Sequence, residues 1–315
     1  MSLSLPELVA RARDGDARSV ARLISLVENG SPQLPAVAAA FAADTGKAQV
    51  VGLTGSPGVG KSTTTNELVR SLRAAGKRVA VLAVDPASPF SGGAILGDRI
   101  RMQEHTSDPG VYIRSMSTRG QLGGLAAATP QAVRVLEGAG CEVILVETVG
   151  VGQAEVEIAQ LADTTLVLLA PGMGDAIQAV KAGILEIADV FVINKADRPG
   201  ADNTYRDIQG MLALGERAAG DWRPQVVRAV AIKRDGIDDV VAAIDKHRQW
   251  LTDSGTLGER RERRAAVEVE AIALGTLRAR MGSLRVGTPL SALAARVAAG
   301  SLDPYAAAEE LLKAL

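Results

Sequence analysis

The sequence predicts an α/β protein with a mostly parallel sheet that helices cover on both faces. From residue 49 onward, apolar runs alternate with stretches of helical spacing, which implies right-handed βαβ units. Several runs are nearly continuous Val, Leu and Ile, as expected of strands that are buried on both faces. The stretch Gly55–Ser62 fits the phosphate-binding pattern G-x-x-x-x-G-K-[ST] and lies between the first run and a helical segment. Together these observations indicate the P-loop NTPase fold.

Length and charge set the broad class of the protein. The chain has 315 residues, of which 47% are apolar, so it can hold one large α/β domain with helical additions. A net charge of −1 gives no overall attraction to nucleic acid or to anionic membranes. The single Cys141 excludes an internal disulfide, and no apolar run approaches the ~18 residues of a membrane span. We therefore expect a cytoplasmic protein without a nucleic-acid or membrane partner.

An N-terminal helical extension is expected over residues 1–45. Apolar residues recur at helical spacing over residues 3–28, which predicts one helix or a pair of helices. The cluster Asn29–Pro32 ends this pattern, and an alanine-rich helix is expected from about Leu34 to Ala43. The α/β domain is then assigned to residues 46–252, and residues 253–315 are assigned to a C-terminal helical arm.

Strands of the α/β domain are predicted at the apolar runs, and polar residues follow directly after them. In sheets of this kind ligands bind at the carboxyl ends of the strands, so the functional groups should lie just after the runs. The predicted strands are Gln49–Leu53, Arg78–Val84, Val111–Arg114, Glu142–Val146, Thr164–Leu169, Val190–Ile193 and Gln225–Ala231.

The phosphate loop supplies the first group of predicted ligand contacts. Its glycines allow backbone N–H groups to turn toward phosphates, and the following helix adds the positive end of its dipole. Lys61 is expected to reach the β- and γ-phosphates, and Ser62 to offer its hydroxyl to Mg²⁺. The residues predicted to bind nucleotide here are Gly55, Ser56, Pro57, Gly58, Val59, Gly60, Lys61, Ser62 and Thr63.

Two acidic residues are candidates for binding the metal and the attacking water. Glu147 ends an apolar strand, which is the position of a Walker-B carboxylate that holds Mg²⁺. Asp98 lies in a Gly-rich stretch after Asp85, and such a loop is a candidate switch that a γ-phosphate orders. Asp98 either acts on Mg²⁺ and water or only caps the helix that follows, and the local sequence leaves both open. Lys61, Asp98 and Glu147 form the predicted catalytic set.

The stretch Asn194–Asp197, with the spacing N-K-x-D, follows directly after the strand Val190–Ile193. The carboxylate of Asp197 can accept two hydrogen bonds from guanine, from N1–H and from the 2-amino group, which adenine does not offer in that arrangement. A site whose acceptor is left unpaired by the wrong base discriminates strongly, so we predict GTP and GDP as ligands rather than ATP. The predicted base contacts are Asn194, Lys195, Asp197, Ile232 and the backbone N–H of Ala231, which is expected at a strand end.

Longer strings lie between and around these motifs: Asp85–Ser88, Gly93–Met102, Ile113–Gly124, Glu147–Gln153, Pro171–Asp175, Asn194–Asp197 and Trp222–Pro224. These strings resemble those of the MeaB-type GTPases. The resemblance covers nearly the whole chain, and it is specific because long strings match as well as the short GTPase motifs. MeaB-type GTPases are chaperones of adenosylcobalamin-dependent methylmalonyl-CoA mutase, and older labels call relatives arginine/ornithine transport kinases.

The resemblance implies a homodimeric, GTP-hydrolysing protein that protects the mutase and gates its cofactor loading. The partner is then this mutase or a related acyl-CoA mutase, and adenosylcobalamin is bound by the partner. This chain itself binds Mg²⁺ with GTP or GDP. One departure is Ala87, where relatives usually have serine, but the flanking Asp85 and Ser88 are retained. Carried onto this sequence, the metal site comprises Ser62, Asp85, Asp98 and Glu147.

A segment after the strand Thr164–Leu169 is a further candidate for a switch. The local sequence alone favours an ordinary turn between a strand and a helix. In the MeaB-type family the matching segment behaves as a third switch at the mutase interface, which implies that it couples nucleotide state to the partner. The residues expected to carry this coupling are Gly172, Gly174, Asp175, Gln178 and Lys181.

The C-terminal tail admits two interpretations. A highly charged stretch, Glu259–Arg264, leads into apolar residues that recur on one side of a helix. Such a helix is either a solvated surface helix or a dimerisation arm, and the resemblance favours the arm. The predicted sheet is complete before this tail, so a cut after about Ser254 is expected to leave a stable monomer that binds nucleotide.

Two rival functions come from other classes of protein. A GTPase metallochaperone that delivers nickel shares this fold class, but Cys141, His105 and His247 are too few and too scattered to act as its ligands. A transport-linked ATPase or kinase would bind ATP, and the stretch Asn194–Asp197 argues against ATP.

Overall fold

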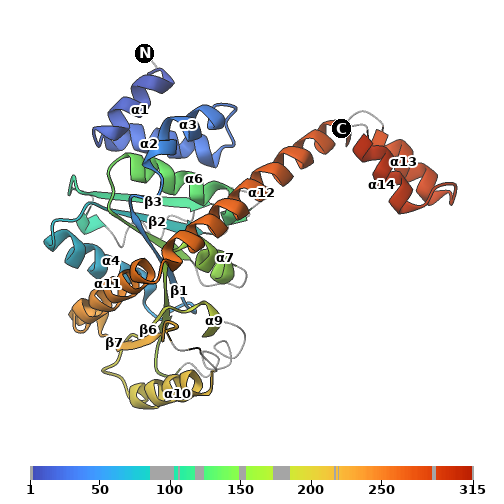
Figure 1. Ribbon diagram of the computed structural model, residues 1–315. Helices are drawn as coiled ribbons and strands as arrows, with labels where there is room; N and C mark the ends of the chain where they lie inside the picture. Colours follow the sequence, from blue (N-terminus) through green and yellow to red (C-terminus); the bar gives the residue numbers. More distant parts are fainter. Residues whose placement is uncertain are drawn as a thin grey trace.

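The computed structural model describes residues 3–85, 103–105, 107–117, 124–148, 154–172, 185–215, 218, 220–285 and 289–313. Its seven described strands form one parallel sheet in the order β3-β2-β4-β1-β5-β6-β7 (Figure 1). The strands are β1 (Gln49–Thr54), β2 (Val79–Asp85), β3 (Val111–Ser117), β4 (Val143–Thr148), β5 (Thr164–Leu169), β6 (Val190–Ile193) and β7 (Gln225–Arg228). The predicted α/β class is confirmed, and all carboxyl ends of these strands lie at one edge of the sheet.

Helices cover both faces of the sheet, because alternate residues of each strand point to opposite sides. In β1, Val51 and Leu53 pack toward α4 and α11, whereas Val50 packs toward α6 and the N-terminal helices. The covering helices are α4 (Lys61–Ala74) and α11 (Ile237–Asp253) on one face, and α6 (Gly124–Gly138), α7 (Ala154–Leu161) and α10 (Ala201–Leu214) on the other. Short helical turns lie at η1 (Ala42–Asp44), η2 (Gln103–His105), α9 (Leu185–Ile187) and η4 (Ala231–Lys233).

The N-terminal segment forms a pair of helices, α1 (Leu5–Arg13) and α2 (Ala17–Glu28), followed by α3 (Leu34–Phe41). The pair is separated at Gly15, whose φ of +83° is the left-handed conformation that ends a helix. Asp16 then begins α2, because its side chain accepts the backbone N–H of Ser19 at 3.0 Å. The sequence left one helix or two open, and these two residues explain why there are two.

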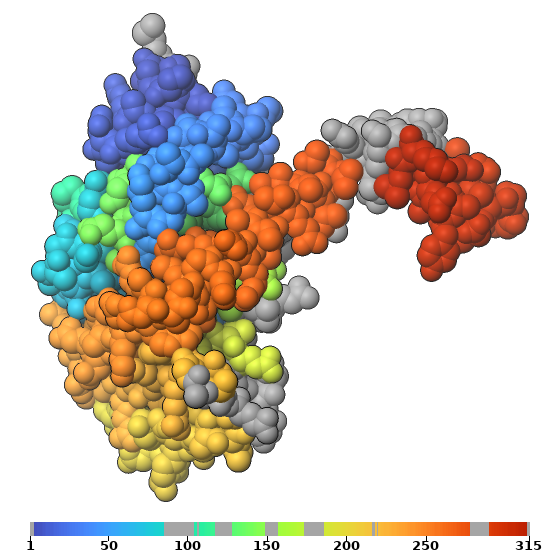
Figure 2. Space-filling model, in the orientation of Figure 1, coloured from blue at the N-terminus to red at the C-terminus, as the bar shows by residue number. Residues whose placement is uncertain are grey.

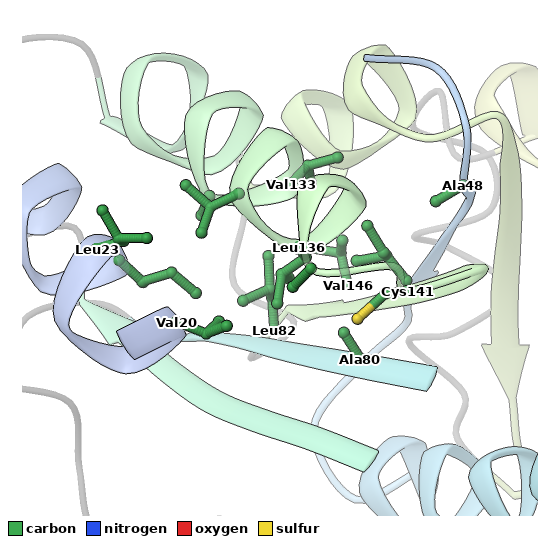
Figure 3. Close-up of a cluster of buried hydrophobic side chains, with 14 of the residues drawn as sticks. Val20, Leu23, Ala48, Ala80, Leu82, Val133, Leu136, Cys141 and Val146 are labelled. Atoms are coloured by element: carbon green, nitrogen blue, oxygen red, sulfur yellow. The ribbon is translucent and has the colours of Figure 1, made fainter. Parts of the chain in front are cut away.

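These N-terminal helices share a core with the sheet. Leu23 of α2 belongs to the same buried cluster as Leu82 of β2 and Leu136 of α6 (Figure 3). Glu28 at the end of α2 also pairs with Arg114 of β3. The described part of this segment, residues 3–45, is mostly helical, and it packs on the sheet without a break at residue 45.

Strand β7 ends earlier than predicted. It stops at Arg228, and the chain leaves the sheet because the N–H of Val230 donates to the carbonyl of Asp235 at 2.9 Å. Arg234 has a φ of 64°, which closes the turn back toward this bridge. Ala231 accordingly begins the turn η4 and lies beyond the strand end where the sequence placed it.

A long helix leads away from the core toward the C-terminus. Its far half projects from the body of the molecule and ends at a small helical hairpin (Figures 1 and 2). The helices are α12 (Thr256–Arg285), α13 (Pro289–Ala298) and α14 (Pro304–Lys313), and the hairpin encloses a small core of Leu293, Ala307 and Leu311. Among the residues described here, no helix meets the length and hydropathy that a membrane span requires.

The first turns of α12 are fixed to the amino end of the sheet by arginines. Arg260 donates two hydrogen bonds to the Asp189 carboxylate, at 2.8 and 3.0 Å, and Arg261 donates two to Asp163, at 3.0 and 3.3 Å. Both aspartates are buried, with Asp163 only 2% exposed. Each also accepts a backbone N–H of a neighbouring strand, at 3.0 and 2.8 Å. The charged stretch is thus only partly solvated, and two of its arginines are bonded to the α/β domain.

This contact changes the expectation for a truncated protein. A cut after Ser254 would remove the arginine partners of two buried carboxylates, and an unpaired buried charge is strongly destabilising. The unit that packs together extends past the predicted boundary at residue 252, as far as Glu268, which pairs with Arg134 of α6 at 2.8 and 3.0 Å.

We predict that Arg261→Met destabilises the protein by about 3 kcal/mol, because it leaves the buried Asp163 carboxylate without its main cation. Urea unfolding followed by circular dichroism measures the change. The matched control is Arg263→Met on the exposed side of the same helix, which should change the unfolding free energy by less than about 0.5 kcal/mol. Equal effects of the two substitutions would contradict the assignment.

Stability should also depend on the protonation of His247. This residue is fully buried beside Trp222, Asp189 and Arg260, and its ring lies 2.9 Å from the Thr164 hydroxyl. Burial lowers the pKa of His247 from its ordinary value of 6.5 to about 4. Between these two pH values the unfolded chain binds a proton at this residue and the folded chain does not. Stability is therefore complete above about pH 6.5 and is lost as the pH falls, by about 2 kcal/mol between pH 7 and 5. Urea unfolding of His247→Gln at both pH values should show a smaller loss.

Candidate nucleotide-binding site

The phosphate loop connects the end of β1 to the start of α4, as the motif predicts. At two positions of the loop, Gly55 and Gly60, close neighbours leave no room for a side chain and the backbone conformation also favours glycine. A Cβ at Gly55 would lie 2.3 Å from the carbonyl oxygen of Leu168, and one at Gly60 would lie 2.3 Å from Nδ2 of Asn194. Their φ angles of +139° and +98° are also unfavourable for other residues. The loop is therefore held tightly against β5 and against the segment after β6.

The ammonium group of Lys61 lies within this loop. Its Nζ donates to the carbonyl oxygens of Gly55 at 2.7 Å and Ser56 at 3.1 Å, and the side chain is buried. Carbonyls are neutral acceptors, and a phosphate oxygen is a stronger acceptor for an ammonium group. A bound phosphate would therefore compete well for Lys61, which agrees with its predicted role.

Glu147 meets the start of α4 at the centre of the sheet. The pairing of β4 with β1 places Glu147 opposite Leu53, two residues before the phosphate loop. Its Oε1 accepts the Ser62 hydroxyl at 2.6 Å, and its Oε2 accepts the Thr65 hydroxyl at 2.9 Å. The side chains of Ser62, Thr65 and Glu147 are buried and offer oxygen atoms, the ligand type that Mg²⁺ prefers. Mg²⁺ commonly takes one or two protein ligands alongside phosphates and water. The group therefore fits the predicted metal.

The amide of Asn194 joins three segments of the site. Its Nδ2 donates to the carbonyl of Val59 at 2.8 Å, and its Oδ1 accepts the backbone N–H groups of Lys195 at 2.8 Å and Ala231 at 3.1 Å. The sequence predicts that both Asn194 and the Ala231 N–H contact the base, and these base contacts stay predictions. In the structure the two groups bond to each other, and Asn194 holds the loops in place.

Lys195 and Asp197 remain at the surface of the site. Lys195 reaches back across the phosphate loop, where its Nζ donates to the carbonyl of Gly58 at 2.6 Å. Asp197 pairs with Lys233 at 2.7 Å, and this ammonium group holds the pKa of the Asp197 carboxyl below its usual range. The carboxylate is thus ionised at neutral pH, as an acceptor for guanine must be. Ile232 is 84% exposed beside this pair, which leaves it accessible to a base.

Several predicted site residues lie outside the described residues or are described only in part. Asp98, Gly174, Asp175, Gln178 and Lys181 lie outside them. The backbone of Asp85 ends β2, next in sequence to Val84, which pairs with Thr148 of β4, so Asp85 lies at the same sheet edge as Glu147. Gly172 is described, with a left-handed φ of +81°, just after β5. Of the remaining loop residues, Pro57 and Thr63 are exposed.

Thr65 and Lys233 are functional candidates that sequence reasoning missed. Thr65 follows Ser62 by three residues, a spacing that places both on one face of a helix. That signal was present in the sequence, but the partner Glu147 lies 82 residues further along the chain. Lys233 similarly meets Asp197 only because the turn after β7 bends back toward β6.

Comparison with known proteins agrees with this geometry. The profile of the family described as methylmalonyl Co-A mutase-associated GTPase MeaB matches residues 20–284. The chain belongs to this family. A candidate GTPase of Pyrococcus abyssi is 47% identical over 312 residues, which cover 98% of this chain and 96% of that protein.

Two further similarities place this MeaB-family protein among its relatives. The methylmalonic aciduria type A homolog of Mus musculus, a mitochondrial protein, is 38% identical over 270 residues, covering 84% of this chain and 65% of the mouse protein. The crystal structure of a LAO/AO transport system kinase superimposes with a TM-score of 0.68 at 26% identity and covers 99% of each chain. The resemblance derived from the sequence is confirmed, and this chain is a GTPase of the MeaB family.

We predict that Asp197→Asn removes guanine selectivity and leaves phosphate binding in place. An amide cannot accept both guanine donors, but it can donate to the 2-carbonyl that xanthine carries instead. Affinity for GDP should fall at least tenfold, roughly the effect of one unpaired donor, and affinity for xanthosine diphosphate should rise. Competition binding with the two nucleotides measures both. The exposed Asp207→Asn on α10 is the control, and a selectivity change there too would contradict the assignment.

Proposed function

We propose that this GTPase binds an adenosylcobalamin-dependent methylmalonyl-CoA mutase, or a related acyl-CoA mutase, and acts as its chaperone by gating cofactor loading. The observation that carries the proposal is the family match over residues 20–284, because that family is described by its association with the mutase. The mouse relative carries the name of a methylmalonic aciduria protein, which points in the same direction. Adenosylcobalamin belongs to the partner in this proposal.

The described residues support a division of labour in GTP hydrolysis. Backbone N–H groups of the phosphate loop and the Lys61 ammonium bind the phosphates, and Ser62 with Glu147 holds Mg²⁺. When bound, Mg²⁺ neutralises charge on the phosphate oxygens. Asp98 is proposed to position the attacking water, and Asp85 to complete the metal surroundings. Hydrolysis by the protein alone is expected to be slow, and the partner is expected to stimulate it.

We propose a homodimer that forms through the C-terminal arm. The far part of α12 exposes several large apolar side chains, which is unusual for a solvated helix and typical of a contact surface. They are Val269, Ile272, Leu274 and Leu277, between 41% and 67% exposed. A second copy of the chain would cover them.

We predict that adding purified methylmalonyl-CoA mutase raises the GTP hydrolysis rate of this protein at least several-fold. ATP should be neither bound tightly nor hydrolysed. Lys61→Ala should abolish hydrolysis with and without the mutase, because the ammonium that meets the phosphates is gone. Phosphate release is the measurement, and circular dichroism checks that the fold is kept. The control is Lys77→Ala, which removes an exposed ammonium group in the loop beyond the C-terminal end of α4.

The same assay tests the proposed coupling segment. Lys181→Ala should retain basal hydrolysis and lose much of the stimulation by the mutase, as should substitutions of its neighbours Asp175 and Gln178. A wild-type protein that the mutase neither stimulates nor retains in size-exclusion chromatography would contradict the proposal. Equal turnover of ATP would contradict the assigned nucleotide.

A further inference from the structure

Both carboxylate oxygens of Glu147 accept hydrogen bonds from one helix, α4. Ser62 donates to Oε1 at 2.6 Å and Thr65 donates to Oε2 at 2.9 Å. The two hydroxyls lie one helical turn apart on the same face of α4. Thr65 is fully buried, and Glu147 and Ser62 are nearly so. This arrangement fixes the plane of the carboxylate as well as its position.

The Thr65 hydroxyl has a choice of acceptors. It lies 3.0 Å from the carbonyl of Lys61, four residues earlier, which is the usual bond of a threonine within a helix. It also lies 2.9 Å from Glu147, and a charged acceptor forms the stronger hydrogen bond. The single hydroxyl proton therefore favours Glu147.

Thr64 shows what a purely structural threonine does in the same helix. Its hydroxyl lies 3.0 Å from the carbonyl of Gly60, again four residues earlier, and it is equally buried. It makes no bond to a carboxylate among the residues that the structure describes. Thr64 and Thr65 thus form a matched pair that differs in the contact with Glu147.

We propose that Thr65 is a positioning residue, which orients Glu147 so that the Ser62 hydroxyl can bind Mg²⁺ through its oxygen while it donates its hydrogen bond to the carboxylate. A hydroxyl that turns a lone pair toward a cation must direct its proton elsewhere, and Oε1 at 2.6 Å accepts it. Thr65 keeps Oε1 in that place by holding Oε2. Thr65 touches neither the nucleotide nor the metal in this account, which rests on the proposed Mg²⁺-dependent guanine-nucleotide site.

The test measures how Mg²⁺ slows the release of fluorescently labelled GDP from the full-length protein. The Mg²⁺ concentration that gives half of the full slowing should rise about tenfold in Thr65→Val, the effect of losing one hydrogen bond to a charged group. Thr65→Ser keeps the hydroxyl and should stay within about threefold of wild type, and Thr64→Val should not move the midpoint. Guanine selectivity should be unchanged in all three variants. Thr65→Ala repeats the test if the valine is poorly accommodated.

Urea unfolding separates this role from a merely structural one. Thr65→Val loses the bond to the Glu147 carboxylate and Thr64→Val loses a bond to a helix carbonyl, so both variants should be less stable, while only the Thr65 change moves the Mg²⁺ midpoint. An unchanged midpoint in Thr65→Val and Thr65→Ala, or an equal shift in Thr64→Val, would overturn the proposal. If Mg²⁺ did not slow GDP release from the wild-type protein, the underlying nucleotide site would be wrong, which is a separate and recognisable failure.

Discussion

The buried amide of Asn194 is the contact on which the geometry of the nucleotide site depends. It links the phosphate loop after β1, through Val59, to the turn after β7, through Ala231, although β5 and β6 separate those strands in the sheet. Neither partner belongs to a regular strand or helix ladder at these atoms. Without the amide, a buried carbonyl and a buried N–H would each lose a partner, at a cost of about 1–3 kcal/mol apiece. The segments predicted to bind the phosphates and the base are held at a fixed separation because this one side chain bonds to both.

The buried carboxylates at the two edges of the sheet have different kinds of partner. At the amino edge, the carboxylates of Asp163 and Asp189 are neutralised within the chain by Arg261 and Arg260, so this edge is closed by protein. At the carboxyl edge, the acid Glu147 accepts the hydroxyls of Ser62 and Thr65, and these can be rearranged around a cation. Charge satisfied by arginine stabilises the fold, whereas charge satisfied by hydroxyls leaves the edge able to bind a ligand.

The sequence was most informative where the pattern is local. The alternation of apolar runs and the phosphate-loop spacing predict the sheet, its carboxyl edge and the elements beside it, because both signals lie within a few neighbouring residues. The contacts that the sequence does not reveal are made with distant partners. The bonds of Asn194 to Val59 and Ala231 span 135 and 37 residues, and the pairs of Arg260 and Arg261 with the buried aspartates span 71 and 98 residues. Single-sequence patterns do not contain such pairings, since they depend on which strand ends the topology brings together.

The first half of α12 contacts two helices, α6 and α7, that begin near the carboxyl edge of the sheet, where the phosphate loop lies. Helix α6 starts after residue 123 and α7 after residue 153, both following strands whose carboxyl ends face the nucleotide site. At the other side of the sheet, Arg134 of α6 pairs with Glu268, and the last carbonyl of α7, that of Leu161, accepts a hydrogen bond from Arg264 at 2.9 Å. Interiors packed this closely do not absorb a displaced helix by compression. A shift of α6 or α7 at the phosphate edge must therefore either break these contacts or move the first turns of α12 with it.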